Sequence, residues 1–130
     1  MKNYLKLLFI FLLMSLTLTK AHSMNFEEAF SASENTPMVV LVYAQWADNY
    51  QNYIQQFKLA EKQMGNKFNF VEMDIASKDA KEFNSRYHIY PNLPYILMYR
   101  NGGRVSRYID RNCSASASCI VPKLKSFIQW

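Results

Sequence analysis

The sequence predicts an α/β fold in which a central mixed sheet of about four strands is flanked by helices, in the order α-β-α-β-α-β-β-α. Three observations predict it. The apolar run Val39–Ala44 has the length and β-branched content of a buried strand, and helical spacing follows at Tyr53 and Phe57. Further strand-like runs alternate with helical patterns, which calls for parallel pairing through right-handed crossovers. Asn101-Gly102-Gly103 separates two later apolar runs and predicts an antiparallel hairpin.

The first half of the predicted domain is a helix, a buried strand and a second helix. Apolar residues at helical spacing predict the first helix over Asn25–Ser33, and the strand covers Met38–Ala44. The second helix is expected from about Asn49 to Met64, where Gly65 is a stop signal. Asp48 precedes it, so we expect this carboxylate to cap the first free backbone N–H groups of the helix.

The second half adds a strand, a helix, the hairpin and a final helix. Ser77 is placed to cap the third helix, and Pro122 is expected in the first turn of the last helix, where its missing N–H costs nothing. The segment Ile89–Pro94 contains two prolines and cannot be helical. The predicted elements are the strand Phe68–Ile75, the helix Ser77–Tyr87, the strands Tyr95–Arg100 and Arg104–Ile109, and the helix Val121–Ile128.

Residues 1–23 have the pattern of a secretory signal peptide. Lys2 and Lys6 precede an apolar run over Leu7–Leu18, and small residues around Ala21 offer a cleavage site. The run is short for a membrane span of roughly 20 residues. The alternative is an uncleaved anchor at the same place. We expect an exported protein, periplasmic or extracellular, whose residues 24–130 form one domain without a membrane span.

The charge of the predicted mature chain argues against nucleic-acid binding. Loss of Lys2, Lys6 and Lys20 with the signal lowers the formal net charge from +5 to +2, so part of the basicity belongs to the signal. His88 is the one histidine that remains, and its surroundings match no metal-ligand spacing. We therefore expect no nucleic acid, no metal and no cofactor.

Two segments resemble the thioredoxin family. In that family a strand ends in Trp followed by Cys-Gly-Pro-Cys at a helix start, and here Trp46 is followed by Ala47-Asp48-Asn49-Tyr50. The family also carries a cis-proline loop opposite this motif, which Leu93-Pro94 matches. The resemblance extends over Phe26–Trp130 and implies a thioredoxin-like fold with a groove between the two loops.

The chemistry of that family needs groups that this sequence lacks at the matching positions. Thiol–disulfide exchange requires a thiolate nucleophile and a resolving thiol, and positions 47 and 50 are Ala and Tyr. The family often carries a buried Asp on the preceding strand, and Leu41 occupies that position here. The family's Lys that neighbours this Asp corresponds to Phe70. The motif is therefore expected to be redox-inactive.

The two cysteines, Cys113 and Cys119, lie elsewhere. Five small residues separate them in what we expect to be a flexible loop, and export favours a disulfide between them. That bridge would tether the last helix to the sheet. The chain returns here towards the proline loop, so the alternative is a disulfide that exchanges with a partner. Against this alternative, the sequence shows no helix N-terminus nearby that would lower the pKa of a thiol. Free or metal-bound thiols are a third alternative.

Three functions follow from these observations. The first is binding of a protein or peptide at the old active-site groove, extended by Tyr90. The second is a thiol-disulfide oxidoreductase that acts through Cys113 and Cys119, and the third is a structural subunit of an envelope assembly. The sequence leaves the partner and the oligomeric state open. The residues expected to frame the groove are Trp46, Ala47, Asp48, Asn49, Tyr50, Leu93 and Pro94.

Overall fold

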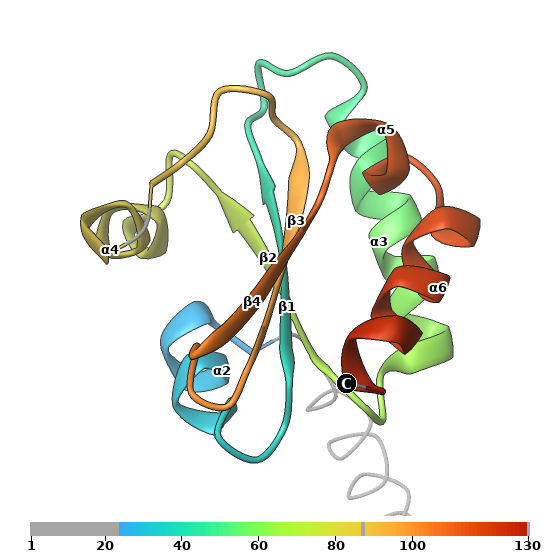
Figure 1. Cartoon of the computed structure of the whole chain (residues 1–130). Coiled ribbons are helices and arrows are strands. Elements are labelled where there is room, and N and C mark those ends of the chain that lie inside the picture. Colours follow the sequence, from blue (N-terminus) through green and yellow to red (C-terminus); the bar gives the residue numbers. More distant parts are fainter. Residues whose placement is uncertain (1–23, 87, 130) are drawn as a thin grey trace, which may run out of the picture.

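The computed structural model describes residues 24–86 and 88–129, and it has the predicted order of elements with one additional short helix (Figure 1). The expected signal segment 1–23, Tyr87 and Trp130 lie outside the described residues. The helices are α2 (Phe26–Ala32), α3 (Tyr50–Met64), α4 (Lys78–Arg86), α5 (Arg111–Ser114) and α6 (Ala117–Ile128). The strands are β1 (Met38–Tyr43), β2 (Asn69–Asp74), β3 (Tyr95–Arg100) and β4 (Val105–Ile109).

The four strands form one mixed sheet in the order β2-β1-β3-β4. β1 runs parallel to β2, with Val40 opposite Val71, and antiparallel to β3, with Val40 opposite Leu97. The hairpin places Leu97 opposite Tyr108 of β4. Because β1 lies between two strands and under helices on both faces, all its residues from Met38 to Val42 are buried, which explains the unbroken apolar run.

Two hydrophobic clusters, one on each face of the sheet, hold the helices in place (Figure 1). Alternate residues of β1 serve them in turn: Val40 belongs to the cluster under α2 and α4, and Leu41 to the cluster under α3 and α6. Phe83 fixes α4, since it is fully buried and its ring meets that of Phe26 edge to face at 5.2 Å. Both faces are therefore packed, as an α/β sheet requires.

Two of the predicted helices, α2 and α4, begin at residues whose side chains cap the helix. The Asn25 side chain accepts a hydrogen bond from the Glu28 N–H at 2.9 Å and caps α2. Ser77 caps α4 as predicted, because its hydroxyl accepts from the Ala80 N–H at 3.3 Å. Gly65 follows the last residue of α3, which confirms the predicted end of that helix.

The carboxyl-terminal segment differs from the prediction. The expected flexible loop between the cysteines is helical, because α5 occupies Arg111–Ser114 and α6 already begins at Ala117. Asp110 starts α5 by accepting a hydrogen bond from the Cys113 N–H at 2.9 Å. Pro122 consequently lies inside α6 and not in its first turn. Proline has no N–H to donate to the Ser118 carbonyl, and both Pro122 and Ser118 lie on the exposed side of the helix.

Candidate functional site

The loop that follows β1 and the loop that precedes β3 meet at one end of the sheet, at the top of Figure 1. They lie together because β3 runs antiparallel to β1, so that the end of β1 lies beside the start of β3. Ala47 of the first loop and Leu93 of the second belong to the same hydrophobic cluster, against which Tyr50 also packs. The structure thus brings together the two segments that the sequence selected.

The proline loop has the predicted backbone. The Leu93–Pro94 peptide bond is cis, and both residues are buried. The Leu93 N–H donates a hydrogen bond to the Pro91 carbonyl at 3.0 Å within the loop itself. Any segment that pairs with this loop would therefore meet the Leu93 carbonyl, which can still accept a hydrogen bond.

The loop after β1 exposes one large apolar side chain. Trp46 is 71% exposed, whereas Ala47 is only 6% exposed. The apolar face expected from Trp46, Ala47, Leu93 and Pro94 is therefore smaller than the sequence suggested, because three of these residues lie in the core. Trp46 supplies the exposed apolar surface of the group.

The helix that follows begins differently from the prediction. Asn49, not Asp48, occupies the N-cap position of α3, and no side-chain cap hydrogen bond is formed there. Asn49 has φ of 60°, in the left-handed region that Asn tolerates better than most residues. The turn that produces this conformation points the Asp48 side chain to solvent, so the prediction that Asp48 caps the helix is wrong.

The positions of the family's two cysteines hold packed side chains. Ala47 is buried, and the Tyr50 ring stacks on Tyr43 at a centroid distance of 5.9 Å and an interplanar angle of 2°. Leu41 and Phe70, which match the family's buried Asp and Lys, both lie in the cluster under α3. These four positions hold Leu, Ala, Tyr and Phe, and none of them carries a thiol, a carboxylate or an amine.

Acidic residues lie beside this stack. Burial raises the pKa of the Tyr43 hydroxyl, and the carboxylates of Asp74 and Glu72 raise it further. Asp74 also accepts a hydrogen bond from the Gln45 amide at 3.1 Å, which joins the end of β2 to the loop after β1. The surroundings of the motif are therefore acidic and rich in amides.

A cavity of about 540 Å³ lies along the loop after β1 and the first turns of α3. Five of the expected groove residues, Trp46 to Tyr50, line it, whereas Leu93 and Pro94 do not. Sequence reasoning missed its other walls, although the run of amide residues from position 45 to 55 was visible as a signal. These additional residues are Gln45, Gln51, Asn52 and Gln55.

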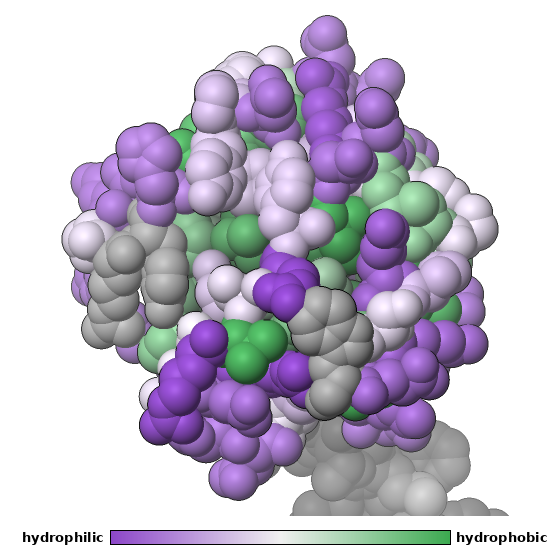
Figure 2. Space-filling model, in the orientation of Figure 1, coloured by the Kyte–Doolittle hydropathy of each residue, from purple (hydrophilic) through white to green (hydrophobic). Residues whose placement is uncertain are grey.

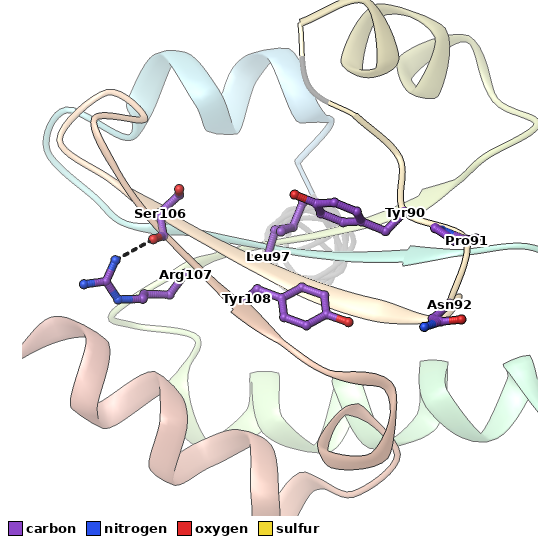
Figure 3. A pocket seen from close by; sticks show the side chains of 7 residues that line it. All are labelled: Tyr90, Pro91, Asn92, Leu97, Ser106, Arg107 and Tyr108. Atoms are coloured by element: carbon purple, nitrogen blue, oxygen red, sulfur yellow. Dashed lines mark hydrogen bonds between the residues drawn. The ribbon is translucent and has the colours of Figure 1, made fainter.

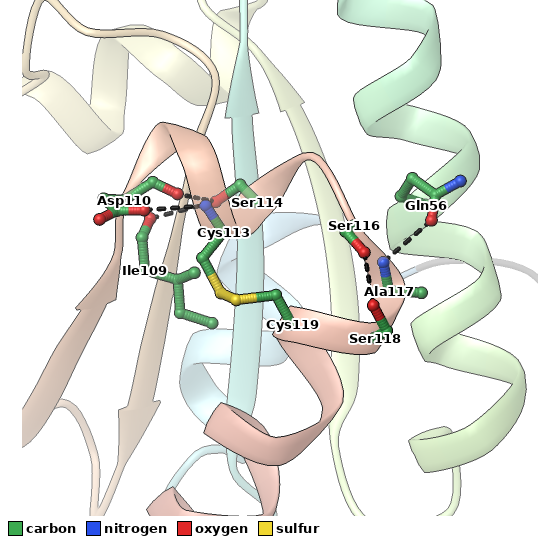
Figure 4. The surroundings of a disulfide bond; sticks show 9 residues. All are labelled: Gln56, Ile109, Asp110, Cys113, Ser114, Ser116, Ala117, Ser118 and Cys119. Carbon is green, nitrogen blue, oxygen red and sulfur yellow. Dashed lines mark hydrogen bonds between the residues drawn. A yellow bond between two sulfur atoms is a disulfide. The ribbon is translucent and has the colours of Figure 1, made fainter.

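The predicted disulfide is present and joins α5 to α6 (Figure 4). Cys113 and Cys119 have Cα atoms 5.2 Å apart, and both side chains are half-buried. Cys119 lies in the first turn of α6, so the expectation that no helix N-terminus lies near the pair is wrong. The bridge is fixed to α3 as well, since the Ala117 N–H donates to Gln56 Oε1 at 2.9 Å.

Within residues 24–86 and 88–129, no cluster of three or more His, Cys, Asp or Glu side chains could hold a metal ion. No helix in the same part of the chain is long and apolar enough to cross a membrane.

The fold and the site define an α/β domain with a helix-start loop and a cis-proline loop at one end of a mixed sheet. A family model described as Thioredoxin matches residues 17–121. The chain therefore belongs to the thioredoxin family. Comparison with curated proteins finds no match.

Solved structures with this fold come from several kinds of thioredoxin. Chloroplastic thioredoxin z matches with a TM-score of 0.64 at 15% identity, over 85% of this chain and 96% of that one. The Trx4 domain of ERdj5 matches with a TM-score of 0.60 at 18% identity, over 82% and 95%. The germline-specific thioredoxin Deadhead from Drosophila melanogaster gives 0.61 at 14% identity, over 78% and 90%. Against a whole ERdj5 chain the match spans 15% of that protein. At these identities the likeness shows the fold alone.

Proposed function

We propose that the protein is exported and binds an extended segment of a partner protein between the loop after β1 and the proline loop, with no thiol chemistry at that place. One observation carries the proposal. On a thioredoxin frame whose two motif positions are Ala47 and Tyr50, Trp46 keeps 71% of its surface exposed at the end of β1. Trp46 lines a cavity together with amide side chains, so a partner would find an apolar anchor next to hydrogen-bonding groups.

The chemistry around Trp46 suits a peptide. Trp is enriched among the residues that dominate protein interfaces, because it buries a large rigid surface. Amide side chains such as Gln51 and Gln55 offer both donors and acceptors, which match the N–H and C=O groups of an extended backbone. The Leu93 carbonyl adds a backbone acceptor from the opposite loop.

Site-specific photo-crosslinking tests this proposal. A photoreactive amino acid is placed at Trp46 and, in a matched control, at Leu59, which is also an apolar residue and is 44% exposed on α3. We expect a discrete crosslinked protein from position 46 and none from position 59. Trp46→Ala should then weaken binding of the purified partner by about tenfold or more. Crosslinks of equal yield at both positions would contradict binding at this loop.

Export is tested separately, by amino-terminal sequencing of the protein recovered from the expressing cell. The proposal predicts a mature chain that begins near Met24. A chain that retains the apolar segment Leu7–Leu18 would instead support the anchor.

A second candidate function is thiol–disulfide exchange through Cys113 and Cys119. The position of Cys119 in the first turn of α6 favours it, because a helix N-terminus stabilises a thiolate. Equilibration of the protein with glutathione, followed by titration of free thiols, measures the reduction potential of the pair. A potential of about −200 mV or higher supports exchange, whereas one below about −300 mV makes the bridge structural.

A further inference from the structure

Strand β4 ends the sheet of the described residues. It pairs with β3 along Val105–Ile109, and the sheet order places no strand of residues 24–86 and 88–129 on its other side. In Figure 1 it crosses the front of the molecule, where the drawing is least faint. An edge strand presents backbone donors and acceptors that another extended segment can use.

A cavity of about 580 Å³ lies against β4 on the sheet face that carries α2 and α4 (Figure 3). Tyr90 of the proline loop and Tyr108 of β4 form its aromatic part, with ring centroids 6.0 Å apart, and they are 49% and 47% exposed. The Tyr95 ring lies behind them and is fully buried. The other walls are Pro91, Asn92, Leu97, Ser106 and Arg107.

A second cavity, of about 250 Å³, lies against the same strand on the opposite sheet face. Met98 and Phe127 form its apolar part, and Lys123 and Ser126 come from α6. Arg107 and Tyr108 line both cavities. Alternate side chains of a strand point to opposite faces, so a segment added beside β4 would place its side chains alternately in these two cavities.

The charged residues that line the two cavities are Arg107 and Lys123, and both are basic. Acidic side chains lie at the two ends of the strand, where Asp110 follows β4 and Glu34 lies near Arg104. Arg107 is exposed on β4, and Lys123 lies in the smaller cavity. Arg104, at the start of the strand, is 3.5 Å from Glu34. Figure 2 shows this side of the molecule as small apolar areas separated by polar and charged residues, so apolar contact alone does not account for a partner. Antiparallel pairing of two β4 strands centred on Arg107 would place two Arg107 side chains opposite each other, which disfavours that register.

We propose that β4 is a docking edge for an extended acidic segment of a partner protein, which adds to the sheet as a further strand. Its apolar or aromatic side chains contact Tyr90 and Tyr108, and its carboxylates lie on the other face near Arg107 and Lys123. Backbone pairing supplies the affinity, and the two cavities supply the selection of alternate side chains. This surface shares Tyr90 and Pro91 of the proline loop with the groove of the proposed function, but it does not include Trp46. Binding at β4 does not require binding at Trp46.

Fluorescence anisotropy tests it with a synthetic ten-residue peptide in which Glu alternates with Val around a central Tyr. A second peptide has Lys in place of every Glu. We expect the purified protein to bind the acidic peptide and not the basic one. Arg107→Glu should weaken binding roughly tenfold or more. Lys67→Glu, the same charge change in the exposed turn between α3 and β2, should leave binding unchanged.

Two further measurements separate strand addition from simple charge attraction. Binding should slow hydrogen exchange of the β4 amides, and it should be lost when the peptide is N-methylated along one of its two edges. Equal binding of both peptides, or an Arg107→Glu variant that binds normally, overturns the proposal. It is also overturned if the β4 amides are already protected by a dimer of the protein, since the occupant is then a second copy.

Discussion

Removal of the disulfide should destabilise the domain by an amount that its position sets. The bridge closes a ring with a sequence separation of 6 between Cys113 and Cys119. In the chain-entropy model, a ring of about seven residues stabilises the folded state by about 2 kcal/mol. For a domain of about 100 residues this corresponds to a fall in Tm of roughly 10 °C in the Cys113→Ala/Cys119→Ala double variant.

Urea denaturation followed by far-ultraviolet circular dichroism is the suitable assay. Fluorescence of Trp46 is a poor reporter, because this side chain is already 71% exposed in the folded state. Ser118→Ala, an exposed change between the two cysteines, serves as the control and should shift stability by less than about 0.5 kcal/mol. A loss below about 0.5 kcal/mol in the double variant would refute the ring-closure reasoning. A loss above about 5 kcal/mol would show that the bridge supports native packing beyond that entropy.

Three other predictions concern the core, the helix start and pH. Phe83→Ala should cost about 3–5 kcal/mol in urea denaturation, because the ring is fully buried against Phe26, and Leu59→Ala on the surface should cost far less. Asn49→Val should lower stability by about 1–2 kcal/mol in the same assay, since a β-branched residue is strained at φ of 60°. Burial raises the pKa of Glu72 above its ordinary value of 4.5, so its protonated form is favoured in the folded state, and stability falls as pH rises through the folded pKa. Glu72→Gln should therefore raise Tm at pH 7 relative to the parent chain, and the difference should shrink at pH 3; an equal difference at both pH values would exclude ionisation as the cause.

The sheet and its layers could be predicted because their signals are local. The unbroken apolar run of β1 indicates a strand buried on both faces, and Phe68 and Phe70 alternate with Val71 and Met73 as the two clusters require. The start of the last helix could not be placed in this way. Small residues and Pro122 are typical of a loop that leads into a helix, whereas the first turn of α6 depends on Gln56, 61 residues away.

The candidate site was predictable only where it lies within one segment. Trp46 and its neighbours could be selected from the sequence. The N-cap of α3 is Asn49 and not the predicted Asp48, because the positive φ of Asn49 cannot be read from the spacing of apolar residues. The tyrosine cavity was missed for a different reason. Tyr90 and Tyr108 meet only through the register that sets Leu97 opposite Tyr108, and no local signal fixes that register.

The stacked tyrosines also determine what a pair of cysteines at positions 47 and 50 would have to displace. A change of Tyr50 to cysteine would uncover the Tyr43 ring that it now lies flat against. A cysteine at position 47 would have to fit its sulfur where Ala47 is 94% enclosed. Neither single step yields a working pair, and each lowers stability on its own. A cysteine pair at positions 47 and 50 would therefore need two substitutions, each of which disturbs packing that this structure already has.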